Sequence, residues 1–99
     1  MDSISAFFAQ YCADAPLSFI PARARALNGA APAALAAALL EDLLRQQPAL
    51  RRSSFSAAHA ALQMNDGCLF VRCPSGLLQL LIAYCPQTAR AWYQLAVNC

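Results

Sequence analysis

One turn signal, at residues 65–67, constrains the fold of this chain more than any other feature. Asn65-Asp66-Gly67 supplies the positive backbone dihedrals of a tight hairpin, and apolar residues lie on both sides of it. It predicts that the strand around Leu62-Gln63-Met64 pairs with a second strand over residues 68–73. Side chains alternate along a strand, so we expect Leu69 and Val71 on one face and Phe70 and Arg72 on the other.

Helical periodicity dominates most of the remaining chain. An apolar stripe at helical spacing predicts a first helix over residues 4–12, and Pro32 begins a stronger one that ends near Gln47. Residues 21–27 are expected to form a turn or short helix. Beyond the hairpin, the apolar run 76–84 predicts a helix with Ser75 as N-cap, and 88–97 predicts a C-terminal helical segment. We therefore expect an α+β fold, one domain over residues 1–99, with the order helix, helix, hairpin, helix (ααββα) and a helical C-terminus.

The composition favours a binding function. Hydrophobic residues make up 60% of the 99 residues and charged residues 12%, about half the usual charged share. A domain of this size buries only about 60–70% of its unfolded surface. We therefore expect apolar side chains to contact a partner, which is another protein or a second copy of the chain. The residues expected to form that contact are Phe7, Phe8, Leu77, Leu81, Tyr84, Trp92 and Tyr93.

All seven basic residues are arginines, and the net charge is only +2. Guanidinium groups bind phosphates and carboxylates bidentately, which leaves weak nucleic-acid or anion binding as an alternative. The residues that would serve it are Arg51, Arg52, Arg72 and Arg90. A charge this small, spread along the whole chain, does not favour that alternative over a protein partner.

The sequence predicts no catalytic site, metal or cofactor. His59 is the single histidine, and a strand that carries Cys68 and Cys73 points their thiols to opposite faces. Five cysteines without a secretory signal favour reduced thiols in a cytosol over a disulfide framework. No uncharged stretch is long and apolar enough to span a membrane. We therefore expect a non-enzymatic, cytoplasmic protein.

The stretch Asp66 to Ser75 and the apolar run after it resemble the N-terminal, KH-like interaction domain of the replication initiator DnaA. In that family an aliphatic strand passes through a Pro-Asn or Pro-Ser pair into an apolar helix. The stretch is also similar to the DciA helicase-loader domain, in which a D-G-x-L-x-V-R strand precedes a helix. The resemblance implies a small protein-recruiting module in replication or nucleic-acid handling. A chaperone-like subunit of a secretion complex, or of another obligate complex, stays an alternative.

Overall fold

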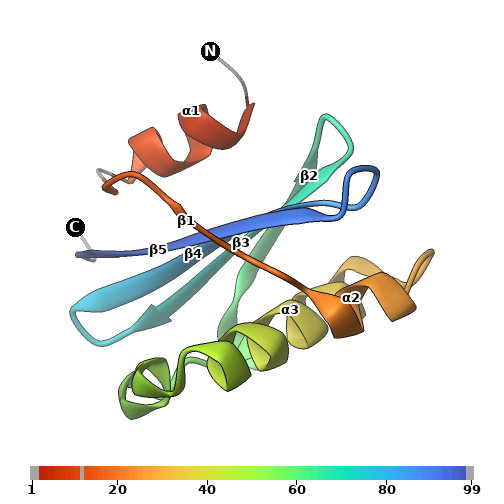
Figure 1. Ribbon diagram of the computed structural model, residues 1–99. Coiled ribbons are helices and arrows are strands. Elements are labelled where there is room, and N and C mark those ends of the chain that lie inside the picture. Colours follow the sequence, from red (N-terminus) through yellow and green to blue (C-terminus); the bar gives the residue numbers. More distant parts are fainter. Residues whose placement is uncertain (1–2, 12, 98–99) are drawn as a thin grey trace.

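The computed structural model describes residues 3–11 and 13–97 and consists of a five-stranded sheet with helices on both faces (Figure 1). The helical elements are α1 (Ser3–Gln10), α2 (Ala22–Ala26), α3 (Pro32–Gln46) and two short 3₁₀ helices, η1 (Pro48–Ser53) and η2 (Ala57–His59). The strands are β1 (Leu17–Phe19), β2 (Ala61–Asn65), β3 (Cys68–Ser75), β4 (Leu78–Cys85) and β5 (Arg90–Val97).

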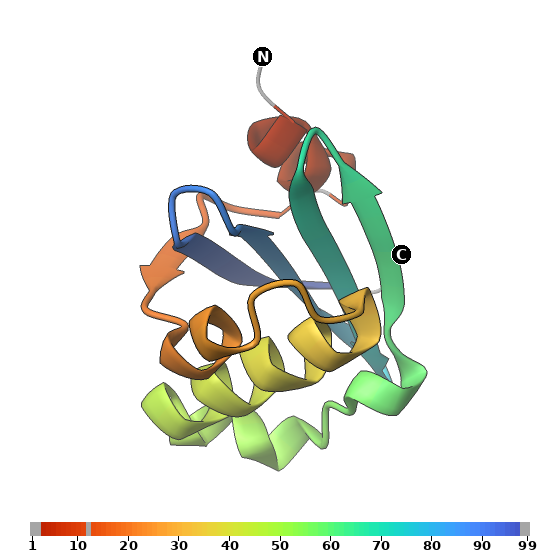
Figure 2. The ribbon, with the colours of Figure 1, turned by 90° about the vertical axis from the view of Figure 1, so that its right-hand side faces the viewer.

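The strands lie in the order β1-β5-β4-β3-β2, and every neighbouring pair is antiparallel. Three of the four pairings join consecutive strands, so β2 to β5 form a meander, and β1 adds to the far side of β5. In Figure 2, α1 lies above the sheet, and α2 and α3 lie below it. The sheet is therefore the middle layer, and β1 and β2 are its two edges.

The predicted hairpin is confirmed. Asn65 pairs with Cys68, and the two residues between them have positive φ values of 52° (Asp66) and 73° (Gly67). Positive φ at both central residues is the requirement of the two-residue turn that matches strand twist. The predicted alternation is confirmed as well, since Leu69 and Val71 join the core on the α3 side and Phe70 the core on the α1 side.

Two predicted helices are also confirmed. Pro32 occupies the first turn of α3, where its missing N–H costs no hydrogen bond. Leu39 and Leu43, four residues apart, are fully buried against the sheet. In α1, Phe8 is buried and Phe7 packs on the ring of Phe70, with 4.9 Å between ring centroids. Cys12, which the sequence placed on the same stripe, lies outside the described residues.

The predicted ααββα order is wrong, because both expected C-terminal helices are strands. Residues 78–85 form β4 and residues 90–97 form β5, so the helices mostly precede the strands. The physical reason is that β4 lies in the centre of a sheet covered on both faces. Its odd and even residues alternate between the α1 and α3 cores, and Leu80, Leu81, Ile82 and Ala83 all have no exposed surface. A strand buried on both faces is apolar throughout, as a buried helix is.

The expectation of reduced thiols is wrong for two cysteines. Cys68 begins β3 and Cys85 ends β4, and the antiparallel register brings them opposite one another in a disulfide. Their Cα atoms are 4.5 Å apart, within the range that a disulfide requires. Cys73 is a buried free thiol, and Cys99 lies outside the described residues.

Candidate functional site

The β2 edge of the sheet, residues 61–65, is formed by an exposed edge strand. All five residues of β2 are exposed, and the strand pairs only with β3 among the described parts of the chain. It forms the green outer strand at the right of Figure 2. An edge strand leaves a row of N–H and C=O groups without strand partners, so it can accept another strand.

The other edge is protected from such pairing. β1 has only three residues, with Pro16 immediately before it and Pro21 two residues beyond its end. Short edges and prolines are the means by which proteins prevent unwanted strand addition. The β2 edge contains neither proline nor any charged residue. The two edges therefore differ in their capacity to bind a strand.

Apolar side chains accompany the β2 edge. Leu62 and Met64 lie opposite Val71 and Leu69, which belong to the core beneath α3. Residues directly opposite one another in a ladder share a face, so Leu62 and Met64 continue that core to the margin of the sheet. They are nevertheless 37% and 51% exposed. A strand added beside β2 would cover both of them.

The pattern of β2 is complementary to itself. If two copies paired antiparallel about Gln63, Leu62 of each would lie opposite Met64 of the other on the α3 side. Gln63 would face its counterpart on the α1 side, where side-chain amides can exchange hydrogen bonds. No like charges would meet, because the strand has none.

The residues that the sequence predicted as partner contacts do not share one surface. Phe8, Leu81, Tyr84 and Tyr93 are buried, and Phe7 and Trp92 are half-buried. Leu77 is 83% exposed, in the turn between β3 and β4. The sequence predicted the strand at residues 62–64 but gave it no binding role. The absence of charge and proline from residues 61–65 was the signal available for it.

The four arginines considered for anion binding are also dispersed. Arg72 lies over the ring of Tyr11, 5.4 Å from its centroid, and contacts Gln79. Arg51 and Arg52 belong to η1, which is fixed at the Ser75 end of β3 by a hydrogen bond from the Ser75 hydroxyl to the Ser53 carbonyl. Arg90 begins β5 at the opposite end of the sheet. They do not form one basic face.

Potentially reactive groups are separated or enclosed. His59 is exposed in η2, whereas Cys73 has no exposed surface, and burial raises the pKa of its thiol to about 11. A thiol with this pKa is neutral and unreactive at physiological pH. Within residues 3–11 and 13–97, no three His, Cys, Asp or Glu side chains are placed to hold a metal ion.

Comparison with family models, curated proteins and solved structures finds no match to this chain. The resemblance to the DnaA and DciA domains therefore stays a prediction, and the run expected to be its apolar helix folds as β4. None of the described helices has the length and apolar character needed to cross a membrane.

Proposed function

We propose that this chain is a non-enzymatic protein-interaction domain that binds its partner by strand addition at the β2 edge. The observation that carries the proposal is the exposed, uncharged, proline-free strand β2, with Leu62 and Met64 uncovered beside the core. In strand addition, main-chain hydrogen bonds supply affinity and alternate side chains supply specificity. The partner that β2 itself fits is a second copy, and another protein presenting a strand can pair in the same way.

The fold itself accommodates most of the apolar excess that was expected to contact a partner. Most aliphatic side chains are enclosed within the single chain, including the whole run from Leu80 to Ala83. Among the described residues, the large apolar side chains that stay exposed lie in three places: the β2 edge, the β1 end with Leu17 and Ile20, and the sheet end with Leu77, Leu78 and Val97. Of these three places in the described chain, only the β2 edge combines exposed apolar side chains with an unprotected strand.

The alternatives receive less support. A nucleic-acid interface needs a concentrated basic face, and the arginines lie at separate places on the sheet and η1. A secretion chaperone or replication accessory would be a particular case of the proposed interaction domain.

The cytoplasmic location expected from the sequence stays a prediction. The Cys68–Cys85 disulfide argues against that location, because disulfides persist mainly in oxidising compartments.

The test places a charge on the edge strand. Met64→Lys introduces the charge that natural edges use against pairing, at an exposed position where folding should be little affected. Sedimentation velocity from about 10 µM to about 1 mM should show self-association of the natural chain, weakened at least tenfold in Met64→Lys. If the natural chain is monomeric, the comparison is repeated by capture from an extract of its host cells.

Leu77→Lys is the matched control, since it removes an even more exposed apolar side chain away from the edge. It should associate as the natural chain does. Equal loss in both variants would indicate general apolar adhesion. An unchanged association in Met64→Lys would contradict strand addition at β2.

A further inference from the structure

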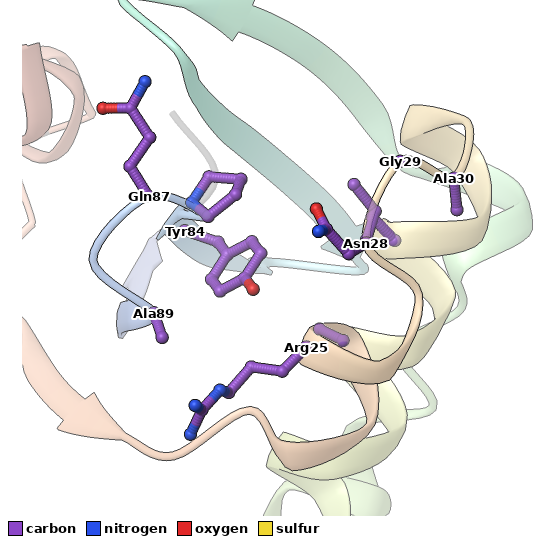
Figure 3. Close-up of a pocket in the computed structure, with 10 residues that line it drawn as sticks. Arg25, Asn28, Gly29, Ala30, Tyr84, Gln87 and Ala89 are labelled. Carbon is purple, nitrogen blue, oxygen red and sulfur yellow. The ribbon is translucent and has the colours of Figure 1, made fainter.

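A cavity of about 460 Å³ opens between α2, the start of α3 and the turn from β4 to β5, and it shares no residue with the β2 edge (Figure 3). Its polar side includes Arg25, Asn28 and Tyr84. Apolar walls come from Leu35, Pro86 and Ala89 among others. Small-molecule sites have volumes of about 300–1,000 Å³ and combine apolar walls with a few convergent polar groups.

Arg25 is the one charged residue among the described residues that line the cavity. No ion pair of Arg25 occurs within the described residues, whereas its neighbours on the same helices are paired. Arg23 bonds Glu41, and Arg45 contacts both Glu41 and Asp42. The cavity therefore has a positive charge that no carboxylate of the described chain neutralises.

Tyr84 supplies the second polar group. The residue is only 2% exposed, yet its ring extends from β4 toward α2, with the hydroxyl on the side that Arg25 and Asn28 border (Figure 3). Burial raises the pKa of the Tyr84 phenol, although the Arg25 charge acts in the opposite direction. The hydroxyl is therefore protonated at neutral pH and can donate a hydrogen bond. No hydrogen-bond partner for it occurs among the residues described.

The Asn28 amide borders the same space, while the Gln87 side chain is turned away from it (Figure 3). A guanidinium, a phenol and an amide can together donate several hydrogen bonds to one anion. A single positive charge matches a carboxylate better than a doubly charged phosphate, and guanidinium binds carboxylates bidentately. Apolar walls would hold the body of the ligand.

We propose that this cavity binds a small organic acid, with its carboxylate at Arg25, Tyr84 and Asn28 and its apolar body against Leu35 and Ala89. The proposal does not depend on the interaction at β2, because the two sites share no residue. It assigns a ligand class and involves no covalent step.

The test is an NMR titration of the isotope-labelled chain with benzoate, in parallel with benzamide, inorganic phosphate and sodium chloride. Benzoate should give saturable amide shifts concentrated at Gly29, Ala30 and Ala89 below about 10 mM. Benzamide, which has the same body without the charge, should bind at least tenfold more weakly. Benzoate shifts that are absent, scattered, or matched by benzamide or phosphate would overturn the proposal.

Two substitutions locate the contacts. Arg25→Gln should weaken benzoate binding about tenfold or more, and Tyr84→Phe about fivefold, as expected for a charged and a neutral hydrogen bond. Arg23→Gln is the control, since it removes the same charge from the same helix outside the cavity, and binding should change less than about twofold. Equal effects of Arg23→Gln and Arg25→Gln would show that benzoate binds by general charge attraction, and this result would overturn the proposed site. Amide spectra with native dispersion confirm that each variant is folded.

Discussion

At the residue scale, one buried carboxylate connects two helices. Asp42 is 2% exposed, and its Oδ2 accepts hydrogen bonds from the backbone N–H groups of Arg23 (2.8 Å) and Ala24 (3.3 Å) at the start of α2. Arg45 lies 3.6 Å from its other oxygen. The neighbouring Glu41 makes its ion pairs in solvent instead. Since α2 also contributes Arg25 to the cavity, Asp42 fixes one wall of that site.

Asp42→Ala should lower the free energy of unfolding by about 2–3 kcal/mol, because it leaves two backbone donors without their acceptor. Glu41→Ala, one position away on the same helix, should cost no more than about 1 kcal/mol, as exposed ion pairs do. Urea unfolding of the two variants measures both values. Equal losses would show that Asp42 does not hold α2 against α3.

At the element scale, the sequence predicted those elements whose pattern has only one interpretation. The Asp66-Gly67 turn and the leucine stripe of α3 predicted the hairpin and the long helix correctly. The run 77–84 has no strongly polar side chain except Gln79, so it fits a buried helix and a doubly covered strand equally well. In β5, Tyr93 and Leu95 face α3, while Trp92 and Ala96 face α1. That alternation separates a strand from a helix only when the covering layers are known.

The strand pairing also explains the disulfide, which the sequence did not predict. If residues 77–84 formed the predicted helix, no strand pairing would bring Cys68 and Cys85 together. Paired as strands, β3 and β4 place Cys68 and Cys85 opposite one another, 17 residues apart in the sequence.

The binding site at the β2 edge was predicted in part, since the sequence placed a strand at residues 62–64. Its position at the edge depends on the order of all five strands, which no local pattern contains.

Reduction of the Cys68–Cys85 bond should lower the free energy of unfolding by about 3 kcal/mol, since it releases a loop of this length in the unfolded chain. Urea unfolding with and without a dithiol reductant measures the change. A variant with both cysteines replaced by alanine should not respond to the reductant. A loss below about 0.5 kcal/mol in the natural chain would contradict a stabilising role for the bond.

At the scale of the whole molecule, the fold has three layers, and the two proposed sites, the cavity and the β2 edge, lie on different parts of its sheet. The cavity lies on the α3 side at the turn from β4 to β5, and the binding edge runs along β2, beyond β3. The helices cover the centre of both faces, so the fold buries its most apolar strand without a partner. What stays open is the margin of the sheet. Association by that margin can extend the sheet without rearranging either core.

Hydrogen–deuterium exchange, followed residue by residue as the chain associates, tests this account most directly. In the free chain the amides of β2 that point away from β3 should exchange rapidly, because no strand protects them. Association with a second copy or a protein partner should slow the exchange of those β2 amides, while β1 and the turn at Gly76 and Leu77 stay unchanged. Protection that appears at β1 or at that turn, with β2 still exchanging freely, would contradict strand addition at the β2 edge.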